Sequence, residues 1–180
     1  MPIASAGNAL VRHLRDRLAE AGALDGWEVE ATTLREAREG AAGRRRVALA
    51  LWRVQPDEAA RDDLPARVAS EADPPDGDGL VLRYLLLARG DDGRAEQTML
   101  GRCMAVLHQH PVVEGPGAPG GLDATALVVT IETPPDDTYR ALAGACGDPP
   151  PLVVPYTVRN VRLLPPTVGR VPDPPGTEMP

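Results

Sequence analysis

Leucines four residues apart form the first apolar pattern of the chain, which covers residues 5–23. They are Leu10, Leu14 and Leu18, and the charged residues between them fall mostly on other faces. This spacing is the period of an amphipathic helix that turns one face toward a core. Residues 5–23 are therefore predicted to form a helix.

Two further helices are predicted in the second half of the chain. Residues 94–108 carry an apolar stripe that includes Met99 and Cys103. The third helix is predicted to open at Thr133, because a hydroxyl residue, two prolines and an acid follow in the order typical of a helix start. Tyr139 lies on the apolar face that this third helix would turn toward the core.

Five stretches have the patterns of β-strands, either alternation of apolar and polar residues or a short dense apolar run. They are residues 27–34, 47–54, 80–88, 126–132 and 151–164. The run at 47–54 favours a central strand, and a short buried helix is the alternative that periodicity alone leaves open. In the last strand the alternation slips at Asn160.

Four stretches are too polar, or too rich in Pro and Gly, to join the core. Residues 35–46 and 114–121 are predicted as loops, and residues 165–180 as a Pro-rich tail. Residues 55–79 are longer than an ordinary connection and are predicted as an extended arm or a mobile loop. The predicted fold is one α+β domain over residues 1–164, with a mixed, mostly antiparallel sheet of about five strands flanked by about three helices.

Composition changes this picture little. The chain has 180 residues, which is enough to bury a core without disulfides or metal. It contains 20 Pro and 18 Gly, a content that approaches that of disordered chains, but all 19 basic residues are Arg. The absence of Lys indicates a GC-rich coding sequence, so the apolar pattern is a better guide than the Pro and Gly content.

The net charge of −7 argues against a protein that binds nucleic acid through its phosphates. The short basic cluster at residues 44–46 is predicted to lie in a solvated loop. The first residues lack the pattern of a signal peptide, and no apolar run reaches the length of a membrane span. The sequence therefore predicts a cytoplasmic protein with neither nucleic acid nor membrane as a partner.

The three histidines do not form a recognisable metal or catalytic set. His13 falls on the charged face of the first predicted helix, and His108 and His110 fall at the end of the second. Because no third ligand stands at a suitable spacing, all three are predicted to be ordinary, partly exposed side chains. Residues 73–79 resemble a calcium loop only superficially, since they lack its ligand order and its closing Glu.

Other chemistry-bearing patterns also fail. No phosphate-binding loop, nucleophile elbow or cysteine with a recognisable His base is present. Cys103 and Cys146 are predicted to be buried and free, each acting as a small hydrophobe. The adjacent acids Asp136 and Asp137 are explained by their place at a helix start. The sequence therefore predicts no catalytic residue, no cofactor and no metal ion, and favours an interaction protein over an enzyme.

Several segments together carry a resemblance to a known family. They are the run VALALWRVQPDE at residues 47–58, LVLRYLLLA at 80–88, LGR at 100–102, VLHQHP at 106–111, PPD at 134–136 and PYTVR at 155–159. In order and spacing they resemble the N-terminal domain of the tail-terminator or cap protein of contractile injection systems. The resemblance is to systems of the antifeeding-prophage and virulence-cassette type, and it covers roughly residues 6–164.

This resemblance implies a structural role in a large assembly. A cap protein of this type is expected to form a ring with copies of itself, with six as the expected number. The ring is expected at the end of the tail that is distal to the baseplate. There it would stop the growth of the inner tube and the sheath and hold the sheath extended. The implied partners are therefore other copies of the chain, the inner tube protein and the sheath protein.

Two other classes stay open, a small ligand-binding or enzymatic α+β domain and a monomeric adaptor. An enzyme requires a pocket with convergent polar groups, whereas a ring requires two different complementary surfaces on each copy. Residues 55–79, 114–121 and 171–180 are candidate arms between copies. Pairing of exposed strand edges is a further candidate contact.

Overall fold

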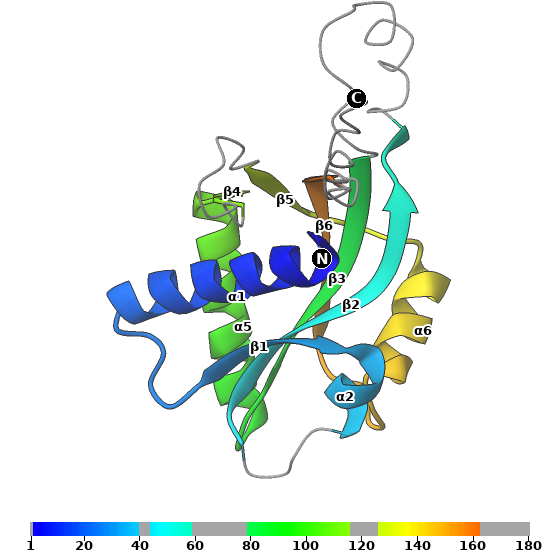
Figure 1. Ribbon diagram of the computed structural model, residues 1–180. Helices are drawn as coiled ribbons and strands as arrows, with labels where there is room; N and C mark the ends of the chain where they lie inside the picture. Colours follow the sequence, from blue (N-terminus) through cyan, green and yellow to red (C-terminus); the bar gives the residue numbers. More distant parts are fainter. Residues whose placement is uncertain (1, 40–43, 59–78, 116–125, 163–180) are drawn as a thin grey trace, which may run out of the picture.

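The structure, a computed structural model, describes residues 2–39, 44–58, 79–115 and 126–162. Its elements are shown in Figure 1. In chain order they are α1 (Pro2–Glu20), β1 (Glu28–Thr33), α2 (Leu34–Glu39), β2 (Arg46–Pro56), β3 (Gly79–Arg89), α5 (Gly93–Gln109), β4 (Val112–Val113), β5 (Leu127–Ile131), α6 (Asp136–Ala145) and β6 (Val153–Arg162).

One six-stranded sheet runs through the molecule in the order β1-β2-β3-β6-β5-β4. The pair β1 and β2 is parallel, and the other four neighbouring pairs are antiparallel. The predicted α+β class with a mixed, mostly antiparallel sheet is therefore confirmed. All five predicted strands are present, including the run at residues 47–54, which forms β2.

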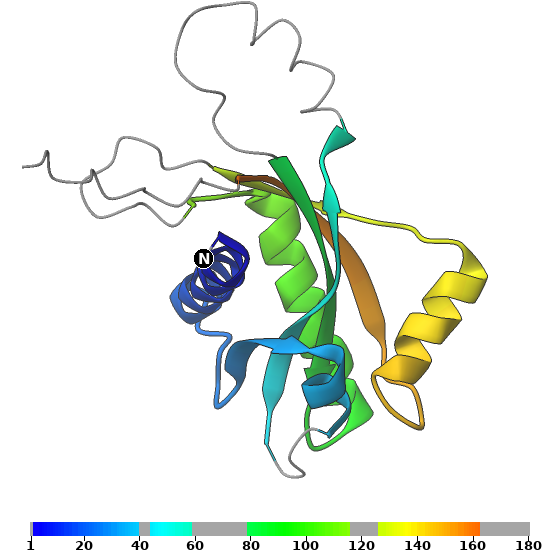
Figure 2. The same ribbon diagram turned by 45° about the vertical axis from the view of Figure 1, so that its right-hand side comes forward.

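Helices cover the two faces of the sheet in pairs (Figures 1 and 2). Helices α1 and α5 pack on one face, over the larger cluster of buried side chains, which includes Leu14, Leu86 and Val158. Helices α2 and α6 pack on the other face, over a smaller cluster that includes Leu85 and Leu87. Because alternate residues of β3 point to opposite faces, this strand contributes to both clusters.

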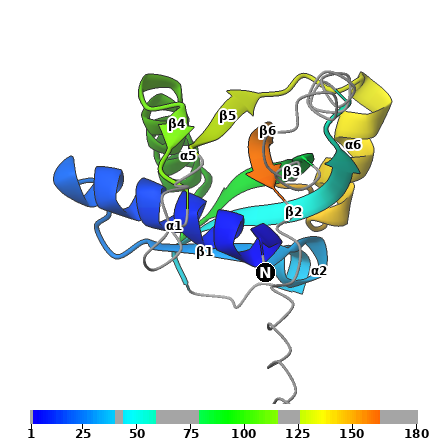
Figure 3. The same ribbon diagram turned by 45° about the horizontal axis from the view of Figure 1, so that its top comes forward.

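Helix α1 lies inside the curl of the sheet, where it contacts both edge strands, β1 and β4 (Figure 3). Leu10, Leu14 and Leu18 are each no more than 1% exposed, so the predicted leucine face is the face that packs. Close approach is helped by Gly7, where an added Cβ would lie 3.3 Å from the Cβ of Ala31 in β1. The apolar face of α1 therefore links the two edge strands of the sheet.

Two short elements were absent from the sequence-based prediction. Residues 35–46, predicted as a loop, contain most of α2, four residues that the structure leaves undescribed, and the start of β2. Val112 and Val113 form β4, which adds a sixth strand at the edge. The predicted cap of the third helix is wrong, because α6 starts after Pro135 and has no side-chain cap bond, so Thr133 does not cap it.

The slip in the alternation of β6 is a β-bulge. Leu80 pairs with Val161 and Leu82 pairs with Val158, so Arg159 and Asn160 both lie opposite one residue of β3. Asn160 has a φ of 64°, a left-handed conformation that Asn adopts more readily than most residues. The extra residue returns Val161 to the larger buried cluster.

Longer segments join the sheet at one of its ends. Strand β2 ends there at Pro56, which pairs with Leu80 near the start of β3, and Gly79 pairs with Arg162 at the end of β6. The start of β5 and the end of β4 also pair close to this end. Residues 59–78, 116–125 and 163–180 attach here and lie outside the described residues, as do residues 73–78 of the calcium-like stretch and the 164/165 boundary.

Candidate interaction surfaces

The face of the sheet that carries α2 and α6 is covered by these helices over only part of its length. They pack on the part of β2 and β3 that holds Ala48, Ala50 and Leu87. Strands β2 and β3 continue beyond both helices, toward the end where the longer segments attach (Figure 1). Trp52 packs at the border between the covered and the uncovered part.

Three arginines share the uncovered part. Trp52 is an extra residue at a bulge in β2, and the bulge sets Arg53 directly opposite Arg83. Arg83 in turn pairs with Thr157 of β6, and Arg159 lies two residues further along the same face of β6. We call this surface, formed by Trp52, Arg53, Arg83 and Arg159, the arginine face.

Two carboxylates lie beside these arginines. Arg83 forms an ion pair with Glu132, and its guanidinium lies 5.9 Å from the centre of the Trp52 ring. Glu132 also accepts a hydrogen bond of 3.0 Å from the hydroxyl of Thr157. Arg159 lies 3.8 Å from the carboxylate of Asp57. Arg83 is thus held in place by a carboxylate and by a ring, a pairing typical of partly buried arginines.

The positive charge of this surface exceeds its negative charge by one. Burial lowers the pKa of Arg83, and the neighbouring charges of Arg53 and Arg159 lower it further. The Nε of Arg83 and the indole nitrogen of Trp52 are both buried, and neither has an acceptor among the described residues. Like charges directly opposite each other in a sheet are unfavourable, and buried donors without acceptors are costly. The arginine face therefore favours contact with an anionic group.

The β1 edge of the sheet is largely blocked. Glu28 N–H donates to Arg45 in the approach to β2, so alternation turns the backbone groups of Val29, Ala31 and Thr33 outward. The carbonyl of Val29 accepts a 3.0 Å bond from Arg15 of α1, and Thr33 N–H donates to Glu36. Side chains thus occupy much of an edge that could otherwise add a strand.

The β4 edge is more open. Val129 N–H donates to the carbonyl of Pro111, so the backbone groups of Val112 point away from β5. Val112 is 56% exposed. A shallow groove separates this edge from α1, lined among others by Arg12, Asp16 and Glu114. The two edges of the sheet therefore differ in accessibility.

Helix α1 and the end of α5 bring two histidines together. The rings of His13 and His110 lie 6.3 Å apart in an edge-to-face arrangement, while His108 is exposed. Their proximity depends on how α1 crosses α5, so no local spacing could predict it. The prediction of partly exposed histidines holds, but the pair itself was missed.

Stability should fall as the pH drops through the usual pKa of His13. Burial is the largest effect and lowers the pKa of His13 below 6.5, and the charges of Arg17 and the His110 ring lower it further. A hydrogen bond to the His110 backbone and the charge of Asp16 raise this pKa, but they do not outweigh burial. The unfolded chain then binds more protons, so stability is complete above 6.5 and is lost as the pH falls toward the lower folded value. Urea unfolding of His13→Gln should depend less on pH in this window.

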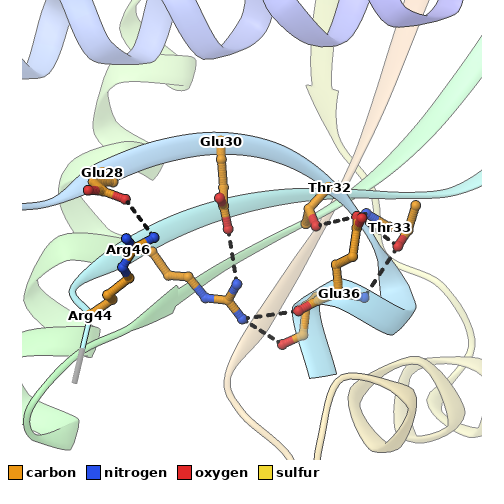
Figure 4. A network of polar contacts seen from close by, with 8 residues as sticks. Glu28, Glu30, Thr32, Thr33, Glu36, Arg44 and Arg46 are labelled. Atoms are coloured by element: carbon orange, nitrogen blue, oxygen red, sulfur yellow. Dashed lines mark hydrogen bonds and ion pairs between the residues drawn. The ribbon is translucent and has the colours of Figure 1, made fainter. Parts of the chain in front are cut away.

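A network of polar contacts ties α2 to β1 and β2 (Figure 4). Glu36 N–H donates to the hydroxyl of Thr33 (3.2 Å), and Thr33 N–H donates back to the Glu36 carboxylate (2.9 Å). This is a capping box, and its Thr-x-x-Glu spacing is visible in the sequence. That signal would have predicted α2, which the charged composition of residues 35–46 concealed.

Arg46 lies at the centre of the same network and is only 9% exposed. Its guanidinium donates to Glu30 (3.0 Å) and to the carbonyls of Ala37 (2.9 Å) and Glu36 (3.3 Å). The prediction that residues 44–46 are all solvated is therefore wrong for Arg46. It is correct for Arg44, which is exposed and lies 3.8 Å from Glu28.

Removal of the Thr33 cap should weaken α2. Thr33→Ala should lower the free energy of unfolding by about 1 kcal/mol, as for other lost caps. Hydrogen bonds from the Thr33 backbone and side chain hold the pKa of Glu36 below its usual 4.5. The stabilisation by Glu36 is therefore present above pH 4.5 and is lost as the pH falls through the folded pKa. Urea unfolding at several pH values should show a smaller acid dependence in Thr33→Ala than in Thr32→Ala, because Thr32 contributes only one hydroxyl bond to the same carboxylate.

The remaining candidate residues lie apart from these surfaces. Cys103 and Cys146 are free and buried, as predicted, and they lie in different clusters on opposite faces of the sheet. Burial raises the pKa of the Cys103 thiol to about 12 and also raises that of Cys146. Asp136 and Asp137 are exposed in the first turn of α6.

In the described part of the chain, no group of three or more His, Cys, Asp or Glu side chains is arranged to hold a metal ion. No helix among the described residues combines the length and apolar character needed to cross a membrane. Apart from the groove between α1 and β4, a shallow depression is lined by Gly26, Glu28, Arg44, Arg45 and Asp91.

Comparison with known proteins identifies the family. The family model described as the Pvc16 N-terminal domain matches residues 6–175, nearly the whole chain. A search of curated proteins found no match. The family match confirms the resemblance found in the sequence and indicates a component of a phage-tail-like contractile system. The chain belongs to the Pvc16 N-terminal domain family.

Proposed function

We propose that this protein is the structural cap, or terminator, of a contractile injection system. It forms a ring of six copies at the end of the particle distal to the baseplate. The ring ends polymerisation of the inner tube and the sheath and anchors the extended sheath. The protein acts in the cytoplasm, where the particle is built, and it catalyses no reaction. The observation that carries this proposal is the family match over residues 6–175.

The distribution of surfaces on the molecule is compatible with this role. A cyclic ring needs two different surfaces on each copy that fit each other after a fixed rotation. The arginine face and the acidic segment 59–78 are one such unlike pair, and the two edges of the sheet, which differ in accessibility, also present unlike surfaces. Surfaces that are not used between copies of the ring can then bind the inner tube and the sheath.

The first test is the state of the purified full-length protein. Light scattering coupled to size exclusion should give a mass of about six times the 19.0 kDa chain, and class averages of electron micrographs should show closed rings. A protein that stays monomeric over the whole accessible concentration range contradicts the proposal. Turnover of a substrate by the pure protein would support the enzymatic alternative instead.

The second test concerns the particle. Cells that lack this protein should produce tubes and sheaths of uncontrolled length, or sheaths that contract early, and the wild-type gene should restore uniform particles. The purified protein should also sediment with capless particles and bind at one end only. Particles of normal length and stability without the protein would exclude a terminator role.

A further inference from the structure

We propose that the arginine face of one copy binds the acidic segment 59–78 of the next copy in the ring. This inference rests on the proposed function, because it requires a ring, and it specifies one contact between subunits. The occupant is therefore a named segment of a second copy of this chain. The contact is heterologous, since the arginine face and the segment are different parts of the molecule.

The chemistry of the arginine face selects an anionic occupant. Arg53 and Arg83 lie directly opposite each other in neighbouring strands, with Arg159 on the same face. Arg83 has one carboxylate partner, Glu132, and its buried Nε has no acceptor among the described residues. An added carboxylate would relieve the repulsion between the guanidiniums and accept from the orphan donors.

The segment between β2 and β3 has the complementary charge. Its acids are Asp62, Asp63, Glu71, Asp73, Asp76 and Asp78, and its bases are Arg61 and Arg67. More than half of the net charge of −7 thus falls within this one stretch. Segment 59–78 is therefore the part of a second copy whose charge best complements the arginine face.

The position and length of the segment allow contact with a neighbour. It leaves the sheet after β2 and returns at Gly79, at the end of the sheet that also carries the arginine face. At about 3.3 Å per residue, twenty residues can reach out and back over about 33 Å. A domain of this size has a radius of gyration of about 15 Å. The tip of the segment can therefore extend past the boundary of its own subunit.

Charge reversal on the exposed arginines tests the contact. The variant Arg53→Glu/Arg159→Glu should weaken ring formation at least about tenfold, measured by light scattering over a concentration series. Arg35→Glu/Arg140→Glu is the matched control, because it makes the same charge change at exposed arginines outside the arginine face. Circular dichroism and thermal unfolding should show that both variants fold.

A charge swap then identifies the occupant. Replacing Asp62, Asp63, Asp73 and Asp76 with lysine should also weaken the wild-type ring. Combining these changes with Arg53→Glu/Arg159→Glu should restore the ring. Mixing the two defective variants should also give rings in which the two kinds of copy alternate, because every junction between unlike copies then joins opposite charges.

Each other outcome overturns the inference in a distinguishable way. If both sets of variants form rings as well as the wild type does, the contact between copies lies elsewhere and the cap function stands. Normal rings with loss of capless-particle binding would assign the arginine face to the tail. Loss of monomer stability without loss of the ring means that the segment binds its own subunit. A monomeric wild-type protein would remove the proposed function and this contact together.

Discussion

Replacement of Leu14 with alanine should lower the free energy of unfolding by about 3 to 4 kcal/mol, the largest single effect expected here. The Leu14 side chain has no exposed surface and lies on the face of α1 that enters the curl of the sheet. Truncation removes buried methyl groups and leaves a cavity, because α1 contacts both β1 and β4 and is not free to move inward. The loss should appear as an earlier midpoint in urea unfolding.

The matched control is Asn8→Ala, an exposed position on the same helix. This change should alter the free energy of unfolding by less than about 0.5 kcal/mol. A loss below about 1 kcal/mol for Leu14→Ala would mean that the leucine face of α1 is not tightly packed against the sheet. Equal losses for both variants would point instead to a general effect on helix formation.

Replacement of Arg46 with methionine should cost about 2 to 3 kcal/mol of folding free energy. Methionine preserves most of the aliphatic packing but removes the donors to Glu30 and to two carbonyls of α2. Helix α2 then loses the Arg46 donor to the carbonyls of Glu36 and Ala37, which lie in its last turn. Urea unfolding measures the loss, and amide exchange in α2 should be faster than in the wild type.

Arg44→Met is the control for this second prediction, because Arg44 belongs to the same basic cluster but is exposed. A surface ion pair at 3.8 Å contributes little, so this variant should lose less than about 0.5 kcal/mol. If the two variants are equally destabilised, burial of Arg46 is not the cause. If neither variant is destabilised, the network around α2 does not contribute to the free energy of unfolding.

The long elements of the fold could be predicted because their patterns are local. Leucines at a spacing of four identify the buried face of α1, and the dense runs around Leu49 and Leu85 identify the central strands, which are buried on both faces. Even the slip at Asn160 was visible, since a bulge shifts the alternation by one residue. Each of these signals depends only on neighbouring residues in the chain.

The short elements failed because composition concealed their signals. Helix α2 is charged and followed by glycine, so the sequence-based prediction divided its capping box between a strand that holds Thr33 and a loop that holds Glu36. Strand β4 has two residues and gives no period at all. The burial of Arg46 follows from the parallel pairing of β1 and β2, a contact that brings Glu30 beside it.

The candidate surfaces required the sheet register. Arg53, Arg83 and Arg159 are separated by many residues in the chain and share one face only because β2, β3 and β6 are neighbours and a bulge at Trp52 sets their alignment. His13 and His110 likewise meet only where α1 passes α5. The sequence favoured an interaction protein and the family, but it could not locate the surfaces.

The attachment of the longer segments at one end of the sheet leaves the opposite end for labelling. There, α6 connects to β6 by a turn whose residues Asp148, Pro149 and Pro150 are exposed. A short peptide tag inserted into this turn would lie far from the arginine face along β6. If the protein forms the proposed cap, gold or antibody bound to the tag would mark one rim of it in micrographs and so reveal which way each copy points along the tail axis.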